Sequence, residues 1–173
     1  MKKLLLLIIL ISYSFSSCEK DDICDANTPT TPRLIIEFYD NDNRENKKNV
    51  TNLSFGGDGL NLPIVYVTGS KIEVPLQLTT TSTKYTFTLN AGNTNPALIF
   101  KDIIQFNYST KTVYVSRACG YKLLFDLNNN PDLPNAFVLN NNPNNTSGTW
   151  IKDITVEKFN LETENETHIK IYF

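Results

Sequence analysis

The sequence predicts an all-β protein, built as a single antiparallel β-sandwich of about eight to ten short strands. The first observation is an apolar period of two: residues 72–78 alternate without a miss, which places Ile72, Val74, Leu76 and Leu78 on one face. The second is that Asn, Gly, Pro and Ser clusters separate the apolar runs. The third is that no window shows the period of an amphipathic helix of ordinary length. A closed β-barrel is the alternative architecture.

The predicted strands are short and rich in β-branched or aromatic residues. In chain order they cover residues 33–39, 49–55, 72–78, 84–89, 103–108, 112–116, 119–127, 151–159 and 168–173, with a further candidate at 63–68. Pro75 cannot donate a hydrogen bond to a neighbouring strand, so its own strand is expected at a sheet edge or beside a bulge.

The first residues have the pattern of a lipoprotein signal peptide. Two lysines precede the apolar run at residues 4–11, and Phe15-Ser16-Ser17 leads into Cys18. An apolar run of this length is too short to cross a bilayer. We therefore expect cleavage before Cys18 and lipidation of its thiol, which would anchor the chain in a membrane through more than one acyl chain. A disulfide cysteine that happens to follow the leader is the alternative.

These features divide the chain into three parts. Residues 1–17 form the predicted signal peptide, residues 18–32 the acylated cysteine, a charged tag and a tether, and residues 33–173 the β-sandwich domain. The last part has the length of one domain with one core. The full chain carries a formal net charge of −2. Because it has no basic stripe, a nucleic-acid partner is not predicted.

The other two cysteines, Cys24 and Cys119, are an even pair in a chain predicted to be exported. A disulfide between them is therefore expected. Cys119 shares strand parity with Tyr121 and Phe125, so its sulfur is expected to point toward the core. The alternative is a thiolate at Cys119 made reactive by the nearby Arg117.

No catalytic or metal-binding constellation is predicted, so the chain is expected to be neither an enzyme nor a cofactor-binding protein. His168 is the only histidine, and its parity with Lys170 predicts a solvent-facing side chain. The loop from Asp126 to Asp132 alternates oxygen-bearing residues as calcium loops do, but Pro131 stands where the sharp turn requires glycine. An Asn-rich connecting loop is the preferred interpretation, and calcium binding there stays open.

Aromatic side chains are the remaining candidates for a binding surface. Five of them are predicted to lie on outward faces, where a sugar- or protein-binding sheet would use them: Tyr39, Tyr66, Tyr114, Tyr172 and Trp150.

Three segments carry a resemblance to a known family: "CEKDDIC" at residues 18–24, "TPTTPRLIIEFYD" at residues 28–40 and "SRACGYK" at residues 116–122. They resemble an uncharacterised family of Bacteroidota lipoproteins, carried as a domain of unknown function, and the likeness is expected to cover the whole mature chain. The resemblance implies a Gram-negative envelope. It also implies that Glu19, Lys20, Asp21 and Asp22 form an export tag that sends the lipoprotein to the cell surface, with a merely solvated start to the tether as the alternative.

The expected function is that of a non-catalytic, lipid-anchored envelope protein that binds a partner or contributes to an outer-membrane assembly. The alternative is a carbohydrate- or small-ligand-binding surface lipoprotein of a nutrient-uptake system. An enzyme that uses Asp126 and Asp132 ranks third. The expected location is the outer membrane, exposed at the cell surface, with its periplasmic face as the alternative.

Overall fold

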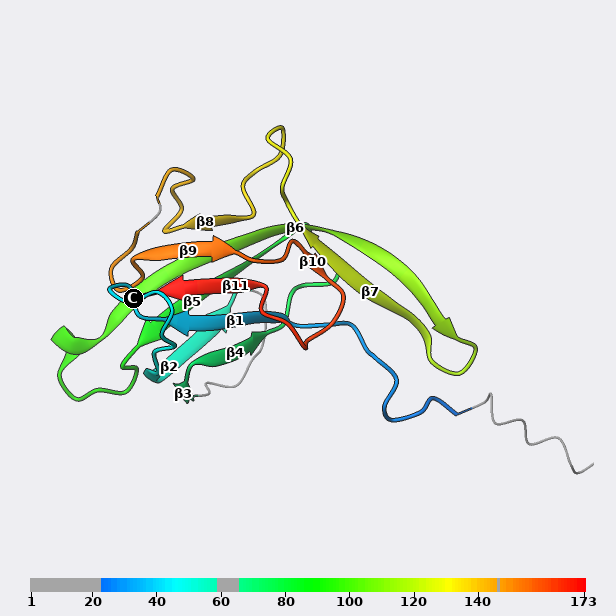
Figure 1. The fold of residues 1–173 in the computed structure, drawn as a ribbon, viewed down its shortest axis with the longest axis horizontal. Coiled ribbons are helices and arrows are strands. Elements are labelled where there is room, and N and C mark those ends of the chain that lie inside the picture. The colour runs from blue at the N-terminus through cyan, green and yellow to red at the C-terminus, as the bar shows by residue number, and fades with distance from the viewer. Residues whose placement is uncertain (1–22, 59–65, 146) are drawn as a thin grey trace, which may run out of the picture.

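Two β-sheets pack face to face in the computed structural model, which describes residues 23–58, 66–145 and 147–173 (Figure 1). The smaller sheet has the order β4 (Lys71–Val74), β1 (Leu34–Tyr39), β11 (Ile169–Tyr172) and β9 (Asp153–Val156). The larger sheet has the order β10 (Asn160–Leu161), β7 (Gly120–Leu127), β6 (Phe100–Ser116), β5 (Ser82–Leu89), β2 (Val50–Gly57) and β3 (Tyr66–Gly69), and β8 (Phe137–Leu139) also pairs with β6. A short 3-10 helix, η2 (Pro96–Leu98), precedes β6.

The predicted β-sandwich is confirmed, and the sheets do not close into a barrel. Of the strand pairs in the described ranges, one departs from the antiparallel expectation: β1 and β11 run parallel, with Ile36 opposite Ile169. Strands from the two ends of the fold therefore lie side by side in the middle of the smaller sheet. A tight hairpin cannot make a parallel pair, so a long crossover is required, and here it consists of all the strands between β1 and β11.

The strand around Pro75 is shorter than its alternation predicts. β4 ends at Val74, immediately before the proline, and it occupies an edge of the smaller sheet, as expected. The Pro75 carbonyl accepts a hydrogen bond from the Tyr85 hydroxyl. Ile72, Val74 and Leu76 are buried as predicted, whereas Leu78 is exposed. Leu78 continues the alternating pattern, but it lies beyond the end of β4. Its place in the pattern therefore does not predict that it is buried.

The two strands predicted at residues 103–108 and 112–116 are one continuous strand, β6, of 17 residues. Its first half pairs with β5 as far as Asn107, and its second half pairs with β7 from Tyr108 onward. The Asn, Ser and Thr residues at its centre resemble a turn in composition, but the larger sheet holds them extended. β6 therefore carries the chain from one end of the molecule to the other.

The core lies between the sheets and is almost entirely apolar and aromatic. Its largest fully buried side chains include Phe38, Tyr85, Phe87, Phe106 and Tyr108. These side chains belong to the alternating apolar residues from which the strands were predicted.

Asp102 is fully buried beside this core, within β6. Its carboxylate accepts hydrogen bonds from the backbone N–H groups of Thr149 at 2.7 Å, Trp150 at 2.9 Å and Ile151 at 3.0 Å, and from Asn140 Nδ2 at 2.8 Å. Burial by itself raises the pKa of Asp102, but these four donors outweigh it and hold the pKa below its usual range. The carboxylate thus fixes the loop before β9 onto the larger sheet.

The expectation that His168 faces solvent is wrong, because its side chain is fully buried. It precedes β11, which lies between two strands, and its ring turns toward β1 rather than outward. Its Nδ1 accepts a hydrogen bond from Ile35 N at 2.9 Å, so the ring is neutral and the proton is on Nε2. Burial lowers the pKa of His168, and the nearby Glu166 carboxylate and Thr163 carbonyl only partly oppose this effect.

This burial predicts that the protein loses stability as pH falls from about 7 to about 5. The unfolded chain binds a proton on His168 near its ordinary pKa, whereas the folded chain resists it, so acid favours unfolding. Urea unfolding at several pH values measures the slope of the free energy of unfolding against pH. A matched variant is His168→Asn, whose amide oxygen can accept from Ile35 N but cannot be protonated, and its slope in this window should be much smaller. Equal slopes for the two proteins would contradict the prediction, since the chain has no other histidine.

Candidate functional site

The outer half of the β6–β7 hairpin extends beyond the sandwich and ends beside the N-terminal segment, at the right of Figure 1. β5 pairs with β6 only as far as Asn107, so among the described strands Ser109–Ser116 has β7 as its one neighbour. The turn lies between Ser116 and Gly120, and Gly120 has φ +69°, a conformation that suits glycine. Cys119 N closes the turn by donating to Ser116 Oγ at 3.0 Å.

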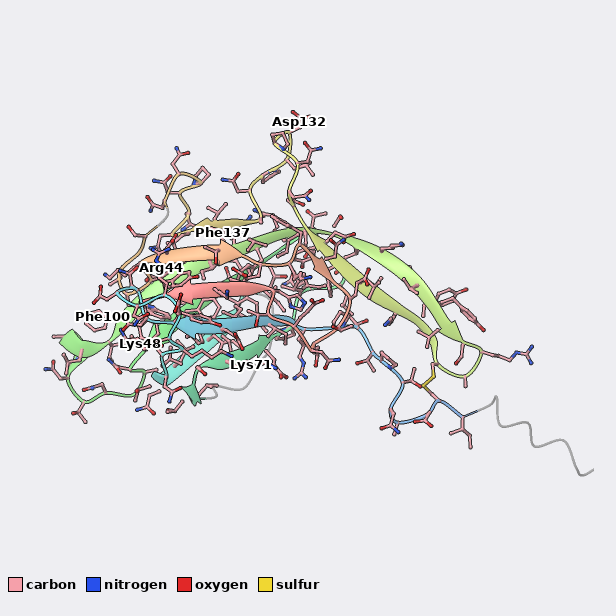
Figure 2. The ribbon with its side chains drawn as sticks, viewed as in Figure 1. Arg44, Lys48, Lys71, Phe100, Asp132 and Phe137 are labelled. Atoms are coloured by element: carbon pink, nitrogen blue, oxygen red, sulfur yellow. A yellow bond between two sulfur atoms is a disulfide. The ribbon has the colours of Figure 1, made fainter. Side chains whose placement is uncertain are left out.

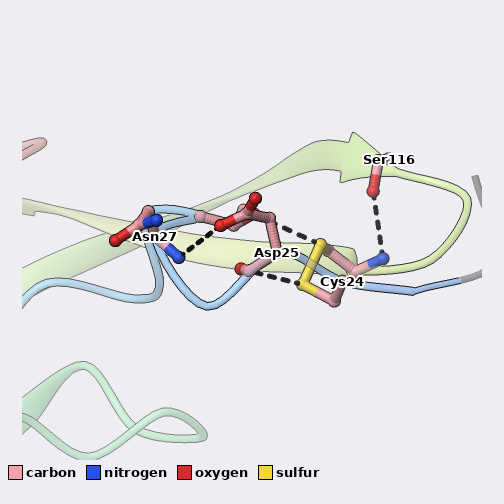
Figure 3. Close-up of a disulfide and its surroundings, with 6 residues drawn as sticks. Cys24, Asp25, Asn27 and Ser116 are labelled. Atoms are coloured by element: carbon pink, nitrogen blue, oxygen red, sulfur yellow. Dashed lines mark hydrogen bonds between the residues drawn. A yellow bond between two sulfur atoms is a disulfide. The ribbon is translucent and has the colours of Figure 1, made fainter. Parts of the chain in front are cut away.

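A disulfide joins Cys24 to Cys119 and holds the N-terminal segment against this tip (Figure 3). Next to it the chain turns at Asp25, whose carboxylate accepts from Asn27 N at 2.7 Å. Thr28 Oγ1 lies 3.6 Å from Cys119 Sγ, and because a disulfide sulfur carries no proton, the hydroxyl is the donor. The pairing predicted from the sequence is therefore present, and it closes 95 residues of chain.

Beyond the disulfide, the segment predicted to be a tether, which ends at residue 32, is held to the domain at one further point, and Arg33, the residue directly after it, makes another contact. Thr31 Oγ1 accepts from Leu123 N at 3.0 Å and so satisfies a donor on the outer edge of β7. Arg33 binds Glu164 through two side-chain hydrogen bonds of 2.7 Å, and its Nη2 also lies 2.6 Å from Glu73 Oε2. The hydrogen bond from Arg33 lowers the pKa of Glu164 to about 2. The described part of the segment therefore follows the surface of the domain.

The hairpin tip brings together three exposed large apolar side chains, whereas Leu78, Leu98 and Leu133 are exposed at other places on the described surface. Ile23 is 81% exposed, Tyr121 71% and Tyr114 58%. The two tyrosines face each other across the hairpin, with ring centres 5.3 Å apart and planes inclined by 65°. Figure 2 shows side chains projecting from this tip near the yellow disulfide bond. We call Ile23, Tyr114, Tyr121 and the disulfide the hairpin tip site.

The concave part of the site, between the N-terminal segment and the turn, has a volume of about 460 Å³. Asp25 and Arg117 are its only charged lining residues among those the structure describes. The described lining residues include no pair of carboxylates and no histidine.

Several sequence expectations about this region are wrong. Cys119 does not point into the core, and Tyr121 is exposed, because the hairpin reaches past the sandwich and no opposing sheet covers its faces. The alternation along a strand predicts on which face of the sheet a side chain lies, but it does not predict where the opposing sheet ends. Tyr121 was therefore missed, although the unbroken β-forming run at residues 110–116 was a signal that the hairpin is long.

Three of the predicted outward aromatics are buried. Trp150 is 5% exposed and packs between Phe38 and Phe173, with ring centres 6.3 Å and 5.5 Å away. The rings of Tyr39 and Tyr172 pack against each other, with centres 5.9 Å apart, on the outside of the smaller sheet. Lys170 lies over the ring of Tyr39, and Arg44 lies over the ring of Tyr172. Tyr114 is exposed as predicted, and the side chain of Tyr66 lies outside the described residues.

The loop from Asp126 to Asp132 uses its polar groups internally. Asp126 Oδ1 accepts from Asn160 Nδ2 at 2.6 Å, and Asn130 Oδ1 accepts from Asp132 N at 2.9 Å. Across the described ranges, no group of three His, Cys, Asp or Glu side chains is arranged to hold a metal ion. These contacts favour the connecting-loop interpretation.

The predicted lipidation site Cys18 and the predicted tag, Glu19, Lys20, Asp21 and Asp22, lie outside the described residues. The same part of the chain holds the predicted signal peptide. Within the residues that the structure describes, no helix has the length and apolar character needed to span a membrane.

Comparison with known proteins identifies the family to which the chain belongs. A model of a family of unknown function, DUF6452, matches residues 49–173, which include β2 to β11 and one half of the disulfide. The chain belongs to the DUF6452 family. No curated protein and no solved structure matches it. The match is shorter than the mature chain over which the likeness was expected.

The DUF6452 match begins after β1, yet β1 belongs to the folded unit, because it lies between β4 and β11 in the smaller sheet. Cys24 and the residues up to Arg33 are also outside the match, although they bind the domain through the disulfide, Thr31 and Arg33. The hairpin tip site thus combines a part of the chain within the DUF6452 match with a part that precedes it.

Proposed function

We propose that this DUF6452 protein is a non-catalytic lipoprotein of the outer membrane, anchored through Cys18, that binds a partner or contributes to an envelope assembly. The observation that carries the proposal is the Cys24–Cys119 disulfide. A structural disulfide is typical of exported proteins, which supports export, and it uses two of the three cysteines of the chain. The third is Cys18, the residue directly after the leader pattern.

The resemblance to Bacteroidota lipoproteins supports a Gram-negative envelope, with Glu19, Lys20, Asp21 and Asp22 as the surface-export tag. The carbohydrate-binding alternative has less support. The rings of Tyr114 and Tyr121, the exposed tyrosine pair of the site, are inclined by 65°. They do not form one flat platform on which a sugar ring would stack.

The proposal predicts that Cys18→Ser moves the protein from the membrane fraction to the soluble envelope fraction. Without a thiol at the processing site no diacylglycerol can be attached, and a chain without acyl groups has no stable hold on a bilayer. Immunoblots of fractionated cells measure the distribution. The control is Cys24→Ser/Cys119→Ser, which should stay in the membrane fraction. Retention of Cys18→Ser in the membrane would refute the anchor.

The proposed surface location has its own test, protease digestion of intact cells. Digestion should remove the wild-type domain, while a variant with alanine at positions 19–22 should resist until the outer membrane is permeabilised. Protection of the wild type on intact cells would place it on the periplasmic face instead.

A further inference from the structure

We propose that the hairpin tip site docks on the lipid surface to which the chain is anchored, with Ile23, Tyr114 and Tyr121 in the headgroup layer. The inference rests on the proposed lipid anchor at Cys18. It adds a second contact between protein and membrane, and it assigns the domain an orientation: the tip faces the bilayer, and the end of the sandwich at η2 faces away.

The reach of the chain is the first argument. Five residues lie between Cys18 and Cys24, which makes six Cα–Cα steps, and a fully extended chain spans at most about 3.3–3.6 Å per residue, so the two Cα atoms are at most about 22 Å apart. The disulfide then adds a Cα–Cα step of only 4.8 Å to Cys119. The turn of the hairpin is therefore held close to the bilayer surface, whatever path the intervening residues take.

Apart from the disulfide and the Thr28 hydroxyl that bonds its sulfur, the first contacts to the domain are at Thr31 and Arg33, so without the bridge the tether could be more than twice as long. The domain would then be free to tumble above the membrane. The disulfide thus connects the anchor to one particular end of the molecule, the end that protrudes.

The exposed side chains are the second argument. Tyrosine is enriched at membrane–water interfaces, because its ring enters the apolar layer while its hydroxyl stays hydrated. Tyr114 and Tyr121 lie next to each other, and Ile23 is adjacent to the disulfide. In a water-soluble domain such a group normally marks a contact surface, and here the nearest surface is the bilayer.

Charge decides what kind of contact this is. Residues 109–124 contain no acidic side chain and three basic ones: Lys111, Arg117 and Lys122. Residues 19–25 carry four carboxylates and one lysine, so the two segments together have no net charge. Attraction to anionic lipids therefore cancels, and the contact depends on the aromatic and apolar side chains. Its strength should change little with ionic strength.

A second copy of the chain is the competing occupant, because the outer edge of β6 beyond Tyr108 has no neighbouring strand in the described part of the chain. Lys111 stands on this exposed stretch, and an edge lysine is a common device against strand pairing between molecules. The membrane is the favoured occupant, because the short link to Cys18 brings it to the tip of every molecule.

The test uses the lipidated protein in vesicles of phosphatidylethanolamine and phosphatidylglycerol, some of whose lipids carry bromine near the headgroup. Bromine quenches tryptophan only on contact. Tyr121→Trp places a probe in the site, and Leu98→Trp places a matched, half-exposed probe at η2, on the far side of 17-residue β6. The chain has one native tryptophan, buried Trp150, whose emission is measured in the unsubstituted protein and subtracted.

The expected result is about a twofold loss of probe emission at position 121 and almost none at position 98. Adding Cys24→Ser/Cys119→Ser should remove most of the difference, and raising the salt concentration should not. Vesicle flotation is measured on the same samples. Protein that does not float refutes the anchor, whereas protein that floats without quenching at position 121 overturns the docking alone. Emission at position 121 that changes with protein density and not with bromine assigns the tip to a second copy and also overturns the proposal.

Discussion

Asp102→Asn should lower the free energy of unfolding by about 3 kcal/mol or more, the largest loss we expect from any isosteric substitution in this chain. Each carboxylate oxygen of Asp102 accepts from two donors: Oδ1 from Thr149 N and Asn140 Nδ2, Oδ2 from Trp150 N and Ile151 N. An asparagine must turn its NH₂ group toward one of these pairs. Two buried donors then lose their acceptor and face a third donor.

Thermal and urea unfolding measure this loss, which corresponds to about 10 °C in Tm for a domain of this size. The control is Asp132→Asn, the same chemical change at an exposed loop position, and its Tm should not change. Gly148→Ala tests the site from the other side, because a Cβ at position 148 would overlap the Asp102 carboxylate. An Asp102→Asn variant as stable as the wild type would show that the carboxylate does not fix the loop.

The lowered pKa of Asp102 gives this substitution a signature in acid. The folded carboxylate resists protonation more than the unfolded one, so its stabilising effect is complete above about pH 4 and is lost as pH falls further. The difference in unfolding free energy between wild type and Asp102→Asn should therefore shrink as pH drops below about 4.

Removing the disulfide with Cys24→Ser/Cys119→Ser should cost about 4 to 5 kcal/mol. The bridge closes a loop of 95 residues, and in the chain-entropy model it restricts the unfolded chain far more than the folded one. The folded domain should keep its β-sheet signal in circular dichroism, because the core does not include the hairpin tip. Urea unfolding under non-reducing conditions measures the loss.

The matched control is the wild-type protein with its thiols reduced and blocked, which should unfold at the same urea concentration as the serine variant. Cys24→Ser alone should behave in the same way. If both forms kept the stability of the oxidised protein, the unfolded chain would already be compact around this bridge, and the entropic account would be wrong.

The sequence predicts the sandwich well, because burial on one face imposes a period of two. Residues 33–39 and 84–89 became β1 and β5 within two residues at either end. It could not predict that β1 and β11 pair in parallel, since alternation describes one strand at a time and not its neighbour. It also divided β6 in two, because the composition at Asn107 and Ser109 resembles a turn when the neighbouring strands are unknown.

For the candidate site, the Cys24–Cys119 pair was predicted from the expected export of the chain and the number of its cysteines alone. It did not predict that the bridge lies at a protruding tip, and so it misplaced Tyr121. His168 was misplaced for a related reason: parity treats its side chain as outward, but a ring that turns toward β1 can bond Ile35 N and stay buried. Where a side chain lies relative to the end of a sheet depends on contacts across the whole fold.

The parallel pairing of β1 with β11 also determines when the molecule can fold. Ile35 N bonds His168 Nδ1 across 133 residues, so the first strand has no central neighbour until nearly the whole chain has been synthesised. Contacts between such distant residues form late and slow folding. The smaller sheet is therefore completed only when β11 has left the ribosome, and a translocation channel that accepts only unfolded polypeptide would receive a chain in which this sheet is still incomplete.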